Sequence, residues 1–140
     1  MRTKKQKSVY GIGVDICNVS RVSEKLLMHG DKFAKKLLTD SEYELYCISS
    51  NKAQYLAKCW ATKESFVKAL GTGFTDEFMW GDISYFSPKS SYLKTNRPVV
   101  RLSERASQSS LMKHKIVHLS VSDEIDNAIA YVVIEEEYNA

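Results

Sequence analysis

Two carboxylates occupy positions where an ordinary surface residue is not expected. Asp15 ends a segment in which glycines alternate with apolar residues, and Glu64 falls on the apolar stripe of a long predicted helix, four residues before Lys68. If the two carboxylates approach each other, their repulsion and partial desolvation require a cation. Two carboxylates with open remaining positions suit Mg²⁺ held jointly with the phosphates of a substrate. The pattern therefore favours phosphoryl-transfer chemistry.

The same residues also allow a purely structural interpretation. Glu64 and Lys68 have the spacing of an ordinary ion pair within one helix, and Asp15 would then cap a turn. An exposed ion pair of this kind contributes only ~0.3 to 0.5 kcal/mol, which is a weak reason to place it on a buried stripe. Spacing alone leaves both interpretations open.

The segment that ends near Asp15 predicts a β-strand over Val9–Ile16. One face carries Gly11 and Gly13. Glycines within a strand mark a place where a backbone or a ligand comes close, or a bulge. The opposite face is apolar and consists of Tyr10, Ile12, Val14 and Ile16.

The longest periodic segment predicts a helix from about Ala53 to Leu70. Gly71 supplies the expected C-terminal stop, within the run Gly71-Thr72-Gly73. This run lies at the wrong end of the helix for a phosphate cradle and lacks the Walker spacing, so a helix cap is favoured over phosphate contact. The apolar stripe consists of Ala53, Leu56, Ala57, Trp60, Ala61 and Val67.

Shorter patterns complete the prediction. A helix is expected over Ser20–His29, Thr39 and Glu42 have the spacing of a capping box that opens another helix, and a further helix is expected over Ser103–Lys115. Helices early and strands late predict an α+β domain. The remaining elements are strands over Asp82–Phe86, Val99–Leu102, Ile116–Ser122 and Ala128–Glu135, an exposed loop over Ser87–Asn96 and a hairpin turn over Asp123–Asn127.

Length and composition fit one globular domain. The chain has 140 residues, of which 44% are hydrophobic and 26% charged, with only six Gly and two Pro. No apolar run approaches the ~18 residues of a membrane span. We expect residues 1–8 to form a flexible basic tail and residues 9–140 to form a single domain.

Charge and cysteine content narrow the partners and the compartment. The net charge of +3 is too small to predict nucleic-acid binding, but it suits an acidic protein or a phosphorylated small molecule. The three cysteines, Cys17, Cys47 and Cys59, form no metal or redox spacing. Reduced thiols of this kind are typical of a cytoplasmic protein.

Two spaced signatures stand in the chain. The first is Val9–Ile16, with the letters VYGIGVDI, followed by Arg21; the second is Tyr55–Gly73, which contains WATKESFVKALGTG. They resemble the two signatures of holo-acyl-carrier-protein synthases, a group of 4′-phosphopantetheinyl transferases: G-[IL]-G-x-D-[IL] followed by Arg, and W/F-x-x-K-E-[SA]-x-x-K-A running into G-T-G. The resemblance covers the chain from Val9 to Glu135.

The resemblance implies a fold, an assembly and an activity. The fold would be that of 4′-phosphopantetheinyl transferases, α+β with an antiparallel sheet packed against a long central helix, in a single-half subunit. Such subunits form homotrimers with active sites between them. The activity would be transfer of 4′-phosphopantetheine from coenzyme A to a serine of apo-acyl-carrier protein in fatty acid biosynthesis, with adenosine 3′,5′-bisphosphate as the other product.

The resemblance also implies roles for particular residues. Asp15 and Glu64 would bind Mg²⁺, and Lys68 would neutralise charge on the phosphates or protonate the departing one. Arg21 and Lys25 would dock the acidic carrier protein. The coenzyme A site would be lined by Lys68, Gly71, Thr72 and Gly73, with Pro98 near the adenine.

Some positions depart from the family pattern. Cys59 stands where the family mostly has Arg, which removes one phosphate contact, and Arg97-Pro98 lacks the usual preceding Gly. Asp123 stands where some relatives have His, and could add to the metal site or orient a water. Two rival functions stay open: a non-enzymatic basic module that binds an acidic protein through Arg21–Lys36, and the same transfer onto carrier domains of polyketide or peptide synthesis.

Overall fold

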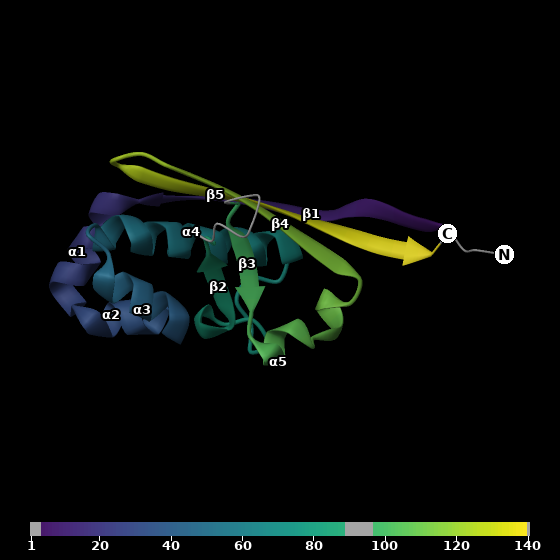
Figure 1. Cartoon of the computed structure of the whole chain (residues 1–140), viewed down its shortest axis with the longest axis horizontal. Coiled ribbons are helices and arrows are strands. Elements are labelled where there is room, and N and C mark those ends of the chain that lie inside the picture. The colour runs from purple at the N-terminus through teal and green to yellow at the C-terminus, as the bar shows by residue number, and fades with distance from the viewer. Residues whose placement is uncertain (1–3, 89–96, 140) are drawn as a thin grey trace.

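The computed structural model describes residues 4–88 and 97–139 and shows an α+β architecture, as expected (Figure 1). Its elements follow one another as β1 (Lys5–Asn18), α1 (Val19–His29), α2 (Asp31–Leu37), α3 (Asp40–Ile48), α4 (Lys52–Leu70), the 3₁₀ turn η1 (Trp80–Asp82), β2 (Ile83–Phe86), β3 (Val99–Leu102), α5 (Glu104–Ser107), the 3₁₀ turn η2 (Ser110–Met112), β4 (Lys115–Asp123) and β5 (Asn127–Asn139).

Two antiparallel sheets frame the long helix. A three-stranded sheet has the order β1-β5-β4, so that β1 and β4 are its two edges, and β2 pairs with β3 in a separate ribbon. Helix α4 runs beneath the three-stranded sheet, while α1, α2 and α3 gather at one end of the molecule (Figure 1). The residues connecting β4 and β5 form a hairpin turn, as predicted.

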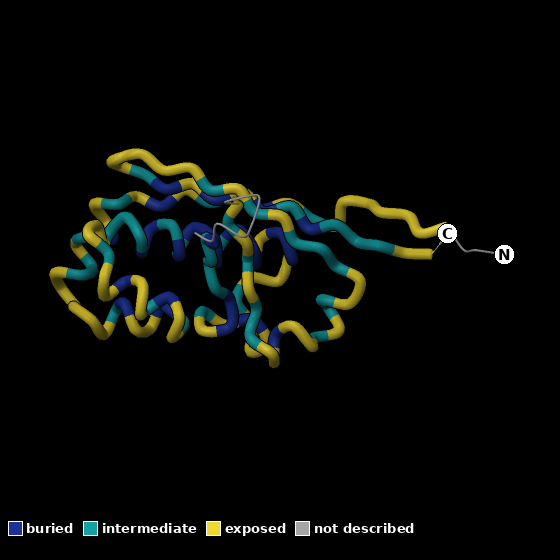
Figure 2. Tube along the Cα trace, viewed as in Figure 1, coloured by how far each residue is buried: buried dark blue, intermediate teal, exposed yellow. Residues whose placement is uncertain are grey.

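Helix α4 is the centre of the core. It packs on β1 and β5 on one side and on α1, α3 and β2 on others, so it is buried well beyond its predicted stripe (Figure 2). Every second residue of strand β5 faces the helix, as in a strand packed on one face, and these residues are small or β-branched. These inward residues are Ala128, Ala130, Val132 and Ile134.

The glycine face of β1 receives the backbone of α4, which confirms the expected close approach. A Cβ atom placed on Gly11 would lie 1.9 Å from the carbonyl oxygen of Ala69, and one placed on Gly13 would lie 2.0 Å from that of Ser65. Only glycine allows this separation between sheet and helix. The apolar face of β1 consequently points away from the core and is exposed.

Three sequence expectations need correction or fall outside the description. The tail expected over residues 1–8 is part of β1 from Lys5 onward, where it pairs with the end of β5. The helix expected over Ser103–Lys115 is wrong. The loop expected over Ser87–Asn96 lies mostly in residues 89–96, outside the described residues.

The segment after β3 forms the short helix α5, capped by Ser103, and then the separate turn η2, because Ser109 caps a new start instead of continuing α5. The Ser103 hydroxyl accepts from the Ala106 amide and that of Ser109 accepts from the Leu111 amide, while Ser107 donates to the Glu104 carbonyl. Such bonds compete with a continuous helix. Within residues 4–88 and 97–139, none of the helices has the length and apolar character needed to cross a membrane.

Candidate active site

Strand β1 and helix α4 bring Asp15 and Lys68 into contact. The Lys68 ammonium lies 3.2 Å from Asp15 Oδ1 and donates to the carbonyl of Val14 at 3.1 Å. The close packing at Gly13 makes this reach short, because Lys68 Cβ lies beside that glycine. Lys68 therefore pairs across elements with Asp15, and the structural alternative of a Glu64–Lys68 pair with Asp15 as a turn cap is wrong.

Glu64 lies one turn before Lys68 and shares the electrostatic environment of Asp15. Burial raises the pKa of the Glu64 carboxyl, the negative charge of Asp15 raises it further, and Lys68 and the indole of Trp60 act in the opposite direction. Burial also raises the pKa of Asp15, against the lowering effects of Lys68 and Arg21. The negative charge of Asp15 thus reaches Glu64, and both carboxylates lie in a partly buried environment.

The charges of both carboxylates affect the pKa of the buried Cys17 thiol. Burial, and then the charges of Asp15 and Glu64, raise its pKa to about 11, against an opposing effect of Arg21. Cys17 follows Asp15 by two residues on the same inward face of β1, with 3% of its surface exposed. It therefore remains a protonated thiol under the site and offers no nucleophile there.

This donor set fits Mg²⁺. Burial raises the pKa of both carboxyl groups, and the charge of Asp15 raises that of Glu64 further, so the two provide oxygen ligands whose negative charge a divalent cation would stabilise. No group of three or more His, Cys, Asp or Glu side chains capable of holding a metal occurs among residues 4–88 and 97–139. Two protein carboxylates, with waters and substrate phosphates completing the shell, is an arrangement that Mg²⁺ adopts readily.

Helix α1 starts directly after β1 and carries two basic side chains at different distances from the carboxylates. Asn18 caps it by accepting from the Arg21 amide, and the positive charge of Arg21 acts on Asp15. The Lys25 ammonium lies 5.9 Å from the ring centre of Trp60. Arg21 is therefore beside the carboxylate site, whereas Lys25 lies one turn further along the helix.

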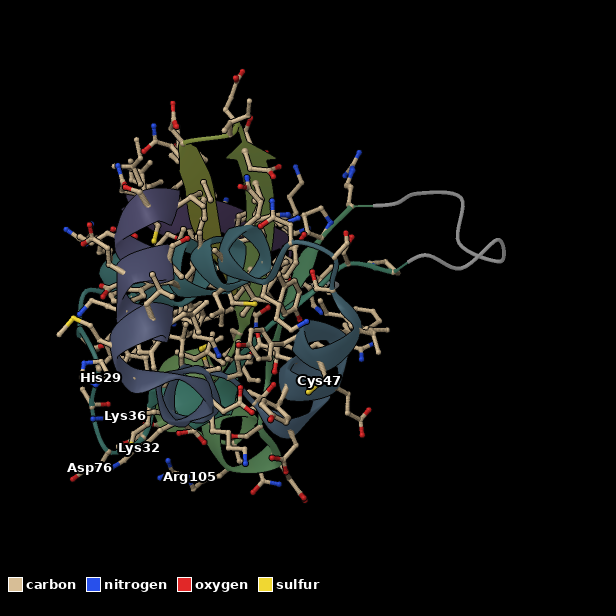
Figure 3. The ribbon with its side chains drawn as sticks, turned by 90° about the vertical axis from the view of Figure 1, so that its left-hand side faces the viewer. His29, Lys32, Lys36, Cys47, Asp76 and Arg105 are labelled. Carbon is tan, nitrogen blue, oxygen red and sulfur yellow. The ribbon has the colours of Figure 1, made fainter. Side chains whose placement is uncertain are left out.

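A basic groove of about 390 Å³ continues from Lys25 between α1, α2 and α4. Its aromatic floor combines Trp60 and Trp80, whose rings meet edge to face at 5.8 Å. Figure 3 shows His29, Lys32 and Lys36 on the same side of the molecule. Sequence reasoning marked the basic run but missed the floor, because Trp80 is distant in sequence. The groove is lined by Lys25, His29, Lys32, Phe33, Lys36, Leu37, Trp60 and Trp80.

The loop after α4 is a helix cap, as its glycines predicted. Gly71 has a φ of 81° and Gly73 a φ of 67°, both left-handed conformations. The amides of Gly71, Thr72 and Gly73 all point at the carbonyl of Val67, at 3.1, 3.3 and 3.3 Å. Because these N–H groups are engaged, the loop presents carbonyls, Cα atoms and the Thr72 side chain to its surroundings, and no free amide cradle.

Asp123 and Cys59 do not join the carboxylates. Asp123 ends β4, at the opposite edge of the sheet from β1, and accepts a hydrogen bond from Gln54 at 2.8 Å. Cys59 is fully buried, so it could reach no phosphate. Pro98 immediately precedes β3.

A second cavity, of about 700 Å³, lies on the Asp123 side of α4. It combines aromatic rings with hydroxyl and amide groups and one lysine. Sequence reasoning missed it because its walls come from α3, α4 and β2 together. It is lined by Leu45, Ile48, Ser49, Ser50, Asn51, Gln54, Tyr55, Lys58, Tyr85, Phe86 and Ser87.

Comparison with known proteins identifies the family. The model of the 4′-phosphopantetheinyl transferase superfamily matches residues 11–130 of this chain. The chain belongs to the 4′-phosphopantetheinyl transferase superfamily. The matched range contains Asp15, Glu64 and Lys68 together, so the family assignment and the site concern the same part of this transferase.

Curated relatives agree with the assignment. Holo-[acyl-carrier-protein] synthase of Vibrio cholerae is 37% identical to this transferase over 128 residues, which are 91% of this chain and 98% of the relative. That of Nitrosomonas eutropha is 34% identical over 130 residues, 91% of this chain and 99% of the relative. The expected family resemblance is confirmed over nearly the full length of both proteins.

Solved structures confirm the expected transferase fold. Holo-[acyl-carrier-protein] synthase from Neisseria meningitidis has a TM-score of 0.81 at 30% identity, covering 91% of this chain and 98% of that one. The Helicobacter pylori enzyme in complex with coenzyme A has a TM-score of 0.71 at 29% identity, covering 88% and 98%. The antiparallel sheet against a long central helix is thus the architecture of this family.

Proposed function

We propose that this transferase moves 4′-phosphopantetheine from coenzyme A to a serine of apo-acyl-carrier protein in fatty acid biosynthesis. The observation that carries the proposal is the convergence of Asp15, Glu64 and Lys68 from β1 and α4 at one partly exposed position. Relatives named as holo-acyl-carrier-protein synthases, and the coenzyme A complex of one of them, support the choice of acceptor and donor.

In the proposed reaction the serine hydroxyl attacks the phosphorus next to pantetheine. The bond from that phosphorus to the bridging oxygen of the diphosphate breaks, adenosine 3′,5′-bisphosphate departs with the bonding electrons, and the hydroxyl proton passes to solvent water. Asp15 and Glu64 would hold Mg²⁺, which supplies charge neutralisation on the diphosphate when bound. Positioning and neutralisation account for most catalysis of this kind.

Lys68 is suited to act on the departing phosphate. Its side chain is 51% exposed although its ammonium pairs with Asp15, whose side chain is 17% exposed. The ammonium can therefore turn from Asp15 to a phosphate oxygen without crossing the core. There it would neutralise developing negative charge or donate a proton to the leaving group.

Coenzyme A would also contact the loop after α4 and the start of β3. Gly71, Thr72 and Gly73 are exposed and begin three residues after Lys68. Because their amides bind Val67, their proposed contribution is close approach and the Thr72 hydroxyl. Pro98 would lie near the adenine.

The acidic carrier protein would dock on α1 through Arg21 and Lys25. Leu27 and Met28 on the same helix are 88% and 75% exposed, so the basic side chains accompany an apolar strip. Basic groups around apolar residues suit an acidic amphipathic partner, because charge guides the encounter and apolar burial holds the complex. The basic groove extends the same surface.

We further propose a homotrimer with active sites between subunits. The exposed face of the three-stranded sheet is apolar, and a contiguous patch of this kind marks an interaction surface. Asp15 lies on β1, an edge strand of this sheet, so a neighbouring subunit would pack close to the carboxylate pair. The exposed apolar residues are Ile12, Val14, Ile16, Ile129 and Tyr131.

The assembly can be tested by its mass in solution. Ile12→Glu combined with Ile16→Glu should convert the trimer to a monomer, because it places charge in the buried interface. Sedimentation equilibrium would measure this. A wild-type protein that sediments as a monomer would contradict the proposed trimer.

The three free thiols, Cys17, Cys47 and Cys59, support placement in the reducing cytoplasm.

The transfer itself is tested by intact mass. Incubation with apo-acyl-carrier protein, coenzyme A and Mg²⁺ should add one phosphopantetheine to one serine. Asp15→Ala or Glu64→Ala should abolish the transfer with the circular dichroism spectrum unchanged, while the exposed control Glu104→Ala keeps it.

Alternative outcomes discriminate the rival functions. Absence of transfer with every carrier tried would favour a non-enzymatic basic module. If transfer to polyketide or peptide-synthesis carrier domains is faster than transfer to the fatty-acid carrier, the assigned acceptor changes but the transfer reaction stays the same. Full activity of either carboxylate variant would overturn the metal assignment.

A further inference from the structure

The residue before Glu64 is a lysine with no exposed surface. The side chain of Lys63 is 0% exposed, and its ammonium donates to Glu42 Oε1 at 2.7 Å, to the carbonyl of Trp80 at 2.8 Å and to that of Ile83. All three of its N–H bonds have acceptors. Lys63 therefore joins α4 to α3 and to the segment η1–β2.

The partner of Lys63 is equally committed. Glu42 is 1% exposed and also accepts from the amide of Thr39 at 2.9 Å through Oε1 and from the amide of Tyr85 at 2.8 Å through Oε2. The capping box predicted at Thr39 is present, but the same carboxylate reaches beyond its own helix. Each charge is thus held by groups from several elements and has no freedom to turn.

Stability alone does not account for a buried pair of this kind. The cost of removing two charges from water is often as large as their attraction, and apolar residues of similar volume can replace such pairs without loss of stability. Directional hydrogen bonds do what apolar contacts cannot: they permit one orientation of the helix and oppose others.

The direction of Lys63 controls the direction of Glu64. Successive side chains on an α-helix are rotated by ~100°, so fixing one residue toward Glu42 also fixes where its neighbour points. On the sheet side the backbone of α4 is held against Gly11 and Gly13. Glu64 lies one turn before Lys68 on α4, and the Lys68 ammonium reaches Asp15 at 3.2 Å, so Glu64 projects from the face of the helix that meets Asp15.

We propose that the Lys63–Glu42 pair is a positioning device for the metal site. It sets the rotation of α4 so that Glu64 faces Asp15 and the two carboxylates can share one divalent ion. This inference rests on the proposed role of the two carboxylates as Mg²⁺ ligands. Lys63 and Glu42 are positioning residues and touch neither the ion nor the phosphates.

The test replaces both charges in the full-length protein. In Glu42→Gln/Lys63→Met, the Gln oxygen still accepts from Thr39 or Tyr85, its amide can donate to a freed carbonyl, and Met preserves most of the apolar stem. The melting temperature is measured by circular dichroism and the Mg²⁺ dissociation constant by calorimetry, both without coenzyme A. We expect a folded protein whose Mg²⁺ dissociation constant is raised at least tenfold and whose transfer rate recovers in part at saturating Mg²⁺.

The matched control is Arg105→Met, which removes a different ion pair of the same chain, with Asp82. It should leave the Mg²⁺ dissociation constant unchanged. A folded double variant with wild-type Mg²⁺ affinity and wild-type transfer would overturn the positioning role. If the wild type binds no Mg²⁺, the metal assignment fails and the positioning role fails with it. If the wild type and the double variant bind Mg²⁺ equally well, only the positioning role fails and the metal assignment survives.

If the double variant does not fold, the variant Glu42→Asp tests the same positioning role. It keeps both charges but shortens the arm by one methylene, so Lys63 must move to remain paired. A smaller rise in the Mg²⁺ dissociation constant, about threefold or more, is expected in a protein with a wild-type spectrum. Unchanged Mg²⁺ affinity in that variant would overturn the proposal.

Discussion

Two lysines five residues apart on α4 do different work. Lys63 has no exposed surface and three fixed acceptors, whereas Lys68 is half exposed and holds Asp15 at 3.2 Å. Both belong to the same signature and carry the same charge. The difference teaches that burial separates a lysine that holds the site in place from a lysine that is free to meet a phosphate.

The largest effect should come from breaking the buried pair on one side only. Lys63→Met alone leaves Glu42 as an uncompensated buried charge, and we expect a loss of about 3 to 5 kcal/mol in the free energy of unfolding. Urea denaturation would measure it. Because Gln removes that charge, the additional Glu42→Gln substitution should restore part of the loss; equal stability of the single and double variants would show that the pair is not coupled.

Lys68→Ala should change the stability little and the transfer rate strongly. Its ion pair is exposed, so the free energy of unfolding should change by no more than about 1 kcal/mol. The loss of a charge that acts on the phosphates should lower kcat by about 10²-fold. Single-turnover transfer and urea denaturation on the same preparation check both halves. A stability loss as large as that of Lys63→Met would contradict the distinction between the two lysines.

Gly13→Ala tests the surface that brings Lys68 to Asp15. The added methyl would overlap the Ser65 carbonyl at 2.0 Å and approach Lys68 Cβ at 3.0 Å. Overpacking of this kind typically costs about 1 to 3 kcal/mol. We expect a lower melting temperature together with weaker Mg²⁺ binding. Gly81→Ala is the matched control, because nothing lies within 4 Å of its added methyl.

The smallest effect concerns a third ion pair, Asp82–Arg105, which is intermediate in exposure. Burial by itself would raise the pKa of Asp82, but hydrogen bonds from Ser103, the Met79 amide and Arg105 outweigh it and the pKa is lowered. A carboxyl with a lowered folded-state pKa stabilises the protein above its unfolded value, near 3.8, and loses that contribution as pH falls through the folded value.

Arg105→Met should therefore cost about 1 kcal/mol or less at pH 7, since Arg105 is 57% exposed. The difference in unfolding free energy between variant and wild type should shrink as the pH is lowered below about 4. Urea melts at pH 7, 5 and 3 would follow it. A difference that grows with acidity would reverse the assigned sign.

Local patterns predicted most of the elements that build the site. The periodicity of α4, its Gly71 stop and the Thr39–Glu42 capping box depend on residues within a few positions of one another, and all three are confirmed. The helix expected over Ser103–Lys115 failed for an equally local reason, because Ser109 accepts from the Leu111 amide and caps a new turn where the helix would have continued. Its composition contained that signal.

Other features depended on distant neighbours. The ion pair of Glu42 joins residues 21 positions apart and that of Asp15 spans 53 positions, so neither spacing could be recognised in the sequence. The second cavity needs walls from three elements. The position of Asp123 beside Gln54 likewise follows from the order of strands in the sheet.

By itself the sequence determined most of the helices and strands, the family signatures they carry and the acids and lysines that are candidates for chemistry. Only the tertiary structure decided that Lys68 pairs with Asp15, that Lys63 is buried against Glu42 and that the apolar face of β1 points outward. The physical reason is that backbone periodicity is set by neighbours along the chain, whereas the partner of a charge and the burial of a face are set by whatever packs against them.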